Sequence, residues 1–160
     1  MISCTFENGN KNNLRHVVVD NLLVKGNKIL LVKRAKRVPS AGKWGLVGGF
    51  MEKNETLKEA VKREILEETG FEIKNINLLI VIDLPFRSPD EERQNVSFVF
   101  FCEAKEKKGN PDWESTEQKW FELDNLPKKE EFAFDHYKMI EIYLDYKKNN
   151  RSLPIFQSPI

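Results

Sequence analysis

Short apolar runs, separated by charged or glycine-containing turns, dominate the chain, and this pattern predicts a β-rich fold. Residues 16–24 form the first expected strand, and Gly26-Asn27 suits a tight hairpin turn into a second strand at 28–33. The second strand is apolar at every position from 29 to 32, which is typical of burial on both faces of a sheet. Further strands are expected at 44–50, 71–86 (one or two strands), 95–104 and 119–123.

One helix is expected between Thr56 and Gly70. Thr56 and Glu59 fit the T-x-x-E capping box, in which each side chain bonds to the other residue's backbone N–H. Gly70 suits a left-handed C-terminal cap. Apolar residues recur between these caps at helical spacing, so one face of the helix is expected to be buried. These residues are Leu57, Ala60, Val61 and Ile65.

A second helix is expected to begin near 134–135 and to run to about residue 148, before Asn149-Asn150. Its apolar residues Ile140, Tyr143 and Leu144 lie on one side. Strands that are buried on both faces need a covering layer on each side of their sheet. The two helices are therefore expected to sandwich the sheet in an α/β fold.

The acidic residues of the first helix do not follow the usual amphipathic pattern. At about 100° per residue, Glu64 and Glu68 fall beside the apolar stripe, and Glu67 lies at its flank within reach of Arg63. Like charges at this spacing repel one another, so a cation is expected among them. Mg²⁺ prefers oxygen ligands and also binds phosphates. The alternative is a charged surface helix, which is the usual reason for a Glu-rich stretch.

The segment 48–71, GGFMEKNETLKEAVKREILEETGF, fits the spacing G-x5-E-x7-R-E-U-x-E-E-x-G-U, where U is a bulky apolar residue. On these residues the chain resembles the Nudix hydrolase family. The W-F-x-L-x-x-L-P at 120–127 and the A-F-D-H at 133–136 resemble its ADP-ribose pyrophosphatase-like members. Val47 and Asn54 replace a proline and a glycine that many members have. Asparagine also tolerates a left-handed backbone, so no loss of function is expected.

The resemblance implies a Nudix-type α/β/α sandwich, with a mixed β-sheet between helices, that hydrolyses a pyrophosphate bond in a nucleoside diphosphate linked to another group. It implies Mg²⁺ as the cofactor, with Mn²⁺ as a substitute. The implied metal ligands are Glu64, Glu67, Glu68 and the Gly48 carbonyl. Glu64 and Glu67 are also counted as catalytic, together with Arg63, which would orient Glu67 or a neighbour.

Nudix enzymes usually need one more acid from a distant loop, as a base or a further metal ligand. Glu114 and Glu117 precede Trp120 and are the candidates, although either residue is equally well explained as an ordinary loop acid. Glu55 would brace its loop or bind metal through water. His136 precedes the apolar run of the second helix, and a packed histidine is a simpler interpretation than a ligand contact.

Candidate substrate-binding residues also lie outside the motif. Arg34 and Arg37 belong to a basic loop that could hold an anionic substrate, and Trp44 and Phe86 offer aromatic surfaces for a base. A solvated loop and core packing are the respective alternatives. ADP-ribose or a similar nucleotide sugar is the expected substrate, with a nucleoside triphosphate, including an oxidised dGTP, as the alternative. A non-catalytic nucleotide-binding protein is a further alternative, against which the intact set of carboxylates argues.

Length and composition add a few limits. The 160 residues are expected to form a single domain, 1–160, with 1–13 and 151–160 as flexible or packed tails. A net charge of +1 gives no reason to expect nucleic acid or an anionic membrane as a partner. Cys4 and Cys102 form neither a disulfide framework nor a metal cluster. Because no signal-peptide or membrane-spanning pattern is found, a cytoplasmic location is expected. A monomer or homodimer is also expected.

Overall fold

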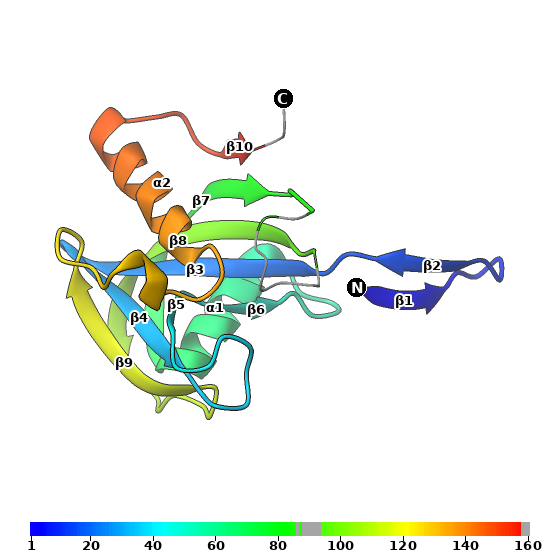
Figure 1. Ribbon diagram of the computed structural model, residues 1–160, viewed down its shortest axis with the longest axis horizontal. Helices are drawn as coiled ribbons and strands as arrows, with labels where there is room; N and C mark the ends of the chain where they lie inside the picture. Colours follow the sequence, from blue (N-terminus) through cyan, green and yellow to red (C-terminus); the bar gives the residue numbers. More distant parts are fainter. Residues whose placement is uncertain (86, 88–93, 158–160) are drawn as a thin grey trace.

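A mixed eight-stranded β-sheet is the centre of the structure, a computed structural model that describes residues 1–85, 87 and 94–157. In chain order, the described strands of this sheet are β3 (Val17–Lys25), β4 (Lys28–Arg34), β5 (Trp44–Gly45), β6 (Val47–Phe50), β7 (Phe71–Ile82), β8 (Val96–Lys107), β9 (Ser115–Glu122) and β10 (Ile155–Gln157). They lie in the order β10-β7-β8-β3-β4-β5, while β6 also pairs with β3 and β9 with β4 (Figure 1). The sheet is mixed because β3 runs parallel to β8 and β10 parallel to β7, whereas the other pairs are antiparallel.

Two α-helices, α1 (Leu57–Thr69) and α2 (His136–Asn149), cover opposite faces of this sheet (Figure 1). Consecutive side chains of a strand point to opposite faces, and β3 illustrates the division. Val19 packs in the hydrophobic core that contains α1, whereas Leu22 packs in the core that contains α2. The α/β/α sandwich expected from the sequence is thereby confirmed.

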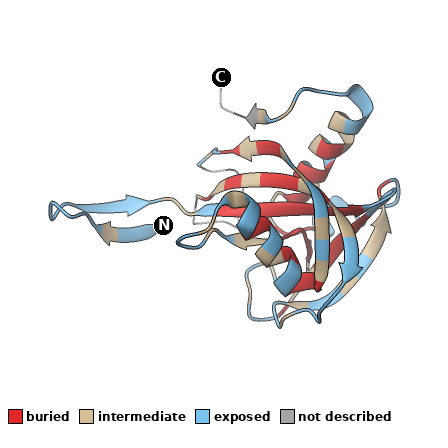
Figure 2. Cartoon of the chain, turned by 180° about the vertical axis from the view of Figure 1, so that it is seen from behind, coloured by how far each residue is buried: buried red, intermediate tan, exposed pale blue. Residues whose placement is uncertain are grey.

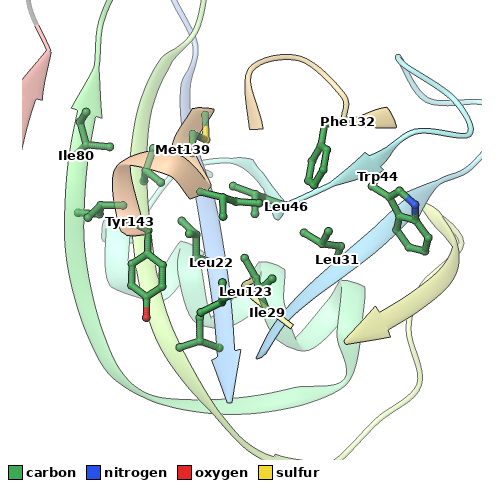
Figure 3. Packing of buried hydrophobic residues seen from close by; sticks show 14 of the residues in the cluster. Leu22, Ile29, Leu31, Trp44, Leu46, Ile80, Leu123, Phe132, Met139 and Tyr143 are labelled. Atoms are coloured by element: carbon green, nitrogen blue, oxygen red, sulfur yellow. The ribbon is translucent and has the colours of Figure 1, made fainter. Parts of the chain in front are cut away.

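Buried residues concentrate in the central strands and in parts of both helices (Figure 2). The core on the α1 side contains Cys102, which is fully buried and packs as a small hydrophobic residue. The core on the α2 side contains Trp44, together with Leu31 and Phe132 (Figure 3). Trp44 is therefore a structural residue, which bears on its predicted role in binding substrate.

The strand predicted at 44–50 is interrupted at Leu46, and the interruption has a clear cause. Gly45 pairs with β4, whereas Val47 pairs with β3, so the chain moves from one neighbouring strand to the other between them. The Leu46 N–H donates to His136 Nδ1 at 2.9 Å instead of to a strand. This change of partner places Gly48 and Gly49 in β6, next to α1.

A separate hairpin precedes the sheet and was not predicted from the sequence. It consists of β1 (Ile2–Thr5) and β2 (Lys11–Leu14), which pair with each other and extend away from the sheet (Figures 1 and 2). Polar residues dominate this segment, so it lacks the apolar alternation that identifies a half-buried strand.

Several element boundaries also differ from those expected. β8 continues to Lys107, past the expected end at 104, and β9 begins at Ser115, before the expected start at 119. A 3-10 helix, Lys129–Glu131, precedes α2, and the C-terminal tail adds β10 to the sheet edge. Most of the segment 87–94, between the strands expected at 71–86 and 95–104, lies outside the described residues. No helix in the described part of the chain is long and apolar enough to cross a membrane.

Candidate active site

The helix that carries the motif acids begins and ends at its predicted caps. The Thr56 hydroxyl accepts the Glu59 N–H at 3.3 Å, and the Glu59 carboxylate accepts the Thr56 N–H at 2.7 Å, which completes the capping box. Gly70 closes the helix in the left-handed conformation, with a φ of 75°. Asn54, in the preceding loop, is also left-handed, with a φ of 70°, as its replacement of a glycine suggested. These local contacts fix the position of α1, and with it the face on which the acids lie.

Arg63 joins three glutamates of the motif in one network. Its Nε and Nη2 donate to the two carboxylate oxygens of Glu55 at 3.0 and 2.8 Å. Its Nη1 donates to Glu64 at 2.8 Å and to Glu67 at 3.2 Å, and Nη2 also donates to the Phe50 carbonyl at 3.0 Å. The hydrogen bonds from Arg63 and from a loop N–H lower the pKa of Glu55. Arg63 therefore orients neighbouring acids, and Glu55 braces its loop against it.

Glu68 is the most deeply buried acid of the motif, with 6% of its surface exposed. Its Oε1 accepts the Gly48 N–H at 2.8 Å. Burial raises the pKa of Glu68 well above its ordinary value, and the charges of Glu64, Asp112 and Glu114 raise it further, against the opposing effect of the Gly48 N–H. This burial agrees with the position predicted for Glu68 from helical spacing, beside the apolar stripe of the helix.

Gly48 presents its backbone polar groups to α1. It lies opposite Asp20 in the antiparallel pair of β3 and β6. Because its N–H bonds to Glu68, this is a non-hydrogen-bonded pair, in which the N–H and the carbonyl both point away from the partner strand. A Cβ on Gly48 would lie 2.0 Å from the Val19 carbonyl oxygen, so no side chain fits there. The Gly48 carbonyl is thus aimed away from β3 and is not used by that strand.

A cleft of about 940 Å³ joins the motif to residues from distant parts of the chain. Two groups of lining residues are chemically different. The acidic end comprises Glu64, Glu67, Asp112 and Glu114. The aromatic end comprises Arg34, Leu46, Phe134 and His136. Arg34 contacts Phe134, Phe134 contacts His136, and His136 accepts a hydrogen bond from Leu46. A ligand that carries a flat apolar part, and an anionic part bound to a cation, would match both ends.

Comparison with known proteins assigns this chain to a family. A family model described as the NUDIX domain matches residues 14–142. The chain belongs to the Nudix hydrolase family. The ADP-ribose pyrophosphatase of Methanocaldococcus jannaschii is 44% identical over 131 residues, which cover 82% of this chain and 74% of that protein. An oxidized purine nucleoside triphosphate hydrolase of Danio rerio is 32% identical over 116 residues, which cover 71% and 70% of the two chains.

Solved structures agree with this assignment. The crystal structure of a NUDIX hydrolase from Nitrosomonas europaea superimposes with a TM-score of 0.76 at 28% identity, covering 98% of this chain and 90% of that one. The fold and the enzyme class predicted from the sequence, a Nudix pyrophosphohydrolase, are confirmed by these similarities.

The Nudix family generally uses divalent metal ions, and the acidic end has suitable donors. Carboxylate oxygens are the ligands that hard cations prefer. A Cβ on Gly49 would lie 2.5 Å from Glu64 Oε1, so only a glycine lets this carboxylate approach the strand. Burial and the charges of Glu67 and Glu114 raise the pKa of Glu64 against the effect of Arg63, so a cation would relieve repulsion there.

The acids are not gathered around one point as they stand. Among the described residues, no group of at least three His, Cys, Asp or Glu side chains has a metal-binding arrangement. Arg63 holds Glu64 and Glu67, while the Gly48 N–H holds Glu68. The donor set fits a hard cation, provided that these carboxylates turn toward it.

The structure distinguishes the two candidates for the remote acid, Glu114 and Glu117, by their positions relative to the cleft. Glu114 lines the cleft, and its charge acts on both Glu64 and Glu68. Glu117 lies in β9 opposite Lys33 and is not among the residues that line the cleft. Asp112 also lines the cleft and was missed in the sequence, although it stands two residues before Glu114.

The candidate substrate-binding residues also differ in whether they line the cleft. Arg34 and Arg37 line the cleft, as expected. Trp44 does not, because its ring is buried in the core on the α2 side, with the Phe121 ring edge-on at 5.0 Å. The core-packing alternative is therefore the better description of Trp44. Phe86 lies outside the described residues.

A polar group that reaches from the cleft into the interior was also missed, apart from His136. The Ser97 hydroxyl donates to Asp20, His136 Nε2 lies 3.6 Å from the same carboxylate, and Arg87 lies 3.9 Å from it. Arg87 also lies 3.7 Å from Asp135. His136 is packed, as the sequence favoured, yet it lines the cleft as well. The one sequence signal for this group was Asp20, an acid in the middle of an apolar strand.

Phe134 has an unusual backbone conformation for an aromatic residue, with a φ of 49°. A side chain in the left-handed region costs roughly 1–2 kcal/mol, which glycine avoids and asparagine reduces. The chain turns sharply here, between the Ala133 N–H, which donates to the Trp44 carbonyl at 2.8 Å, and the start of α2 at His136. The turn explains the conformation but not the choice of phenylalanine.

The stability of the protein should depend on pH through His136. Burial lowers the pKa of His136 from 6.5 to about 4, aided by Arg34 and Arg87 and opposed by Asp20. The unfolded chain therefore takes up a proton below pH 6.5 that the folded protein takes up only near pH 4. The free energy of unfolding should fall as the pH decreases through this window, by roughly 1.4 kcal/mol per unit from this residue.

His136→Asn is the matched variant for this effect, because its amide oxygen can still accept the Leu46 N–H and does not titrate. Urea unfolding of both proteins between pH 7 and pH 4 measures the difference. The acids with raised pKa values are present in both proteins, so their contribution to the pH dependence cancels when the two unfolding free energies are subtracted. An equal pH slope in the variant and the wild type would show that His136 does not contribute.

Proposed function

We propose that this chain hydrolyses the pyrophosphate bond of ADP-ribose in a Mg²⁺-dependent reaction that yields AMP and ribose 5-phosphate. The acidic end of the cleft carries the proposal, because crowded carboxylates beside the glycine pair suit a metal-bound pyrophosphate better than they suit an uncharged ligand. The choice of ADP-ribose is supported by the 44% identity to the ADP-ribose pyrophosphatase of Methanocaldococcus jannaschii.

Glu64, Glu67, Glu68 and the Gly48 carbonyl would hold the Mg²⁺, for which Mn²⁺ is the expected substitute. When bound, the ion supplies positive charge to the phosphate oxygens and lowers the pKa of a bound water. Arg63 restrains Glu64 and Glu67 through its Nη1, so these acids reach the cleft from a fixed direction. To hold the ion, both carboxylates would turn from Arg63 toward it.

Glu114 is the proposed general base. It would accept a proton from the attacking water as the water oxygen bonds to one phosphorus. The bond from that phosphorus to the bridging oxygen then breaks, and the leaving phosphate keeps the bridging oxygen. One water is consumed for each AMP and ribose 5-phosphate formed. Arg34 and Arg37 are the proposed cationic contacts for the remaining substrate charge.

Steady-state kinetics with a panel of substrates tests this proposal. The panel contains ADP-ribose, the common nucleoside triphosphates, 8-oxo-dGTP and a dinucleoside polyphosphate, each with Mg²⁺. We expect kcat/KM for ADP-ribose to exceed the others by about tenfold or more. A preference for a triphosphate would favour the alternative that the Danio rerio relative suggests. Turnover of none of them would leave only nucleotide binding. A cytoplasmic location and a monomeric or homodimeric state stay predictions from the sequence.

A further inference from the structure

Phe134 lines the cleft and belongs to neither hydrophobic core. Its side chain is half-buried, whereas Phe132, two residues earlier, is 3% exposed and belongs to the core on the α2 side. We propose that Phe134 is the platform on which the nucleobase of the substrate stacks, with Arg34 fixing the position of the ring. This inference rests on the proposed function in taking a nucleotide as the occupant of the cleft.

The backbone at this position supports a role for the side chain. The described residues other than glycine with positive φ are Ser40, Asn54, Asn75, Gln94, Phe134 and Asn150. Phe134 is the one aromatic residue in this set. Strained conformations of bulky residues persist where the surrounding structure holds them, and they cluster at ligand sites. Glycine or asparagine would make the same turn more easily, so the ring itself needs an explanation.

The neighbours of Phe134 hold its ring in one orientation. The Arg34 guanidinium carbon lies 5.2 Å from the ring centroid, in a cation–π contact. Arg34 is fixed in turn by a 2.7 Å hydrogen bond from its Nε to the Pro39 carbonyl. The His136 ring meets Phe134 edge-on at a centroid distance of 5.4 Å. A ring that is held on two sides and open to a cleft is preorganised for stacking.

The position of Phe134 relative to the acids fits a nucleotide. A Cβ on Gly45 would lie 3.2 Å from His136 Nδ1, and one on Gly49 would lie 2.5 Å from Glu64 Oε1, so Gly45 lies beside the aromatic end and Gly49 beside the acidic end. The intervening chain spans at most about 14 Å. A nucleoside diphosphate can bridge such a distance between its base and its phosphates. Apolar Val38, Pro39 and Leu46 also line the cleft and suit a flat base better than a ribose rich in hydroxyls.

Binding of reaction products tests the inference without turnover. Isothermal titration calorimetry with Mg²⁺ would measure the Kd of AMP and of ribose 5-phosphate for the wild type, Phe134→Ala, Phe134→Asn and Phe134→Tyr. We expect alanine and asparagine to weaken AMP binding by about tenfold or more, as loss of a stacked base does. Ribose 5-phosphate binding should change less than twofold, and tyrosine should restore AMP binding. Phe132→Leu is the matched control, which should lower the melting temperature and leave both Kd values unchanged.

The possible results separate this inference from the proposed function. Phe134→Asn suits the left-handed backbone, so it keeps the test valid if the alanine variant fails to fold. AMP binding that depends on Phe134 would support the inference even if ADP-ribose were not hydrolysed. Absence of AMP binding by the wild type, an unchanged AMP affinity in both variants, or equal losses for AMP and ribose 5-phosphate would overturn it.

Discussion

Replacing Glu68 with glutamine is expected to preserve folding and to remove most of the activity. Glu68 is buried among Glu64, Asp112 and Glu114, whose charges disfavour its ionised form. Glutamine keeps the shape and still offers an oxygen to the Gly48 N–H, while the repulsion is removed. The melting temperature without metal should therefore stay the same or rise by a few degrees. Activity with Mg²⁺ should fall by about 100-fold or more, because a metal ligand and its charge are lost.

Thermal melts and kinetics of the two proteins, with and without Mg²⁺, measure both effects. We expect Mg²⁺ to raise the melting temperature of the wild type more than that of Glu68→Gln. Glu72→Gln is the control, because Glu72 is an exposed glutamate four residues further along the chain. This control should change neither quantity. Full activity in Glu68→Gln, combined with no effect of Mg²⁺ on the wild-type melt, would rule out the metal site at the acidic end.

The second large effect is expected at Glu114. Glu114→Gln should lower kcat by about 100-fold or more if this residue is the general base, with a small change in KM. Glu117→Gln is a closely matched control, since it makes the same chemical change three residues away but outside the cleft-lining residues. We expect Glu117→Gln to keep nearly all activity. A larger loss of kcat in Glu117→Gln than in Glu114→Gln would assign the base to Glu117. An unchanged kcat in both variants would show that neither residue is the base.

The part of the acidic end that α1 supplies could be predicted because its information is local. The caps Thr56 and Gly70 fix where α1 begins and ends, and helical spacing then sets the directions of Glu64 and Glu68 relative to the apolar stripe. The hydrogen bonds of Arg63 to Glu64 and Glu67 follow from the same spacing. All of these relations lie within one short segment, so the sequence specifies them without knowledge of the rest of the fold.

The aromatic end could not be predicted because it is assembled from distant segments. Arg34 ends β4, Leu46 lies between β5 and β6, and Phe134 precedes α2, so only the folded sheet brings them together. From the sequence, Trp44 was considered as a stacking surface, with core packing as the alternative, and Phe134 was not considered. The burial of Trp44 depends on packing against Phe121 of β9, a contact between residues far apart in sequence. Local patterns carry no information on which of two aromatic rings the core will take.

Analysis of the products of ADP-ribose by ³¹P NMR, with Mg²⁺ and with a chelator in its place, is the most direct test of the proposed activity. We predict that the wild type converts the diphosphate signals into those of AMP and ribose 5-phosphate with Mg²⁺ and leaves them unchanged with the chelator. Glu68→Gln should leave them nearly unchanged in both. Persistence of the diphosphate signals with wild type and Mg²⁺, or equal conversion with the chelator, would contradict a metal-dependent ADP-ribose pyrophosphohydrolase.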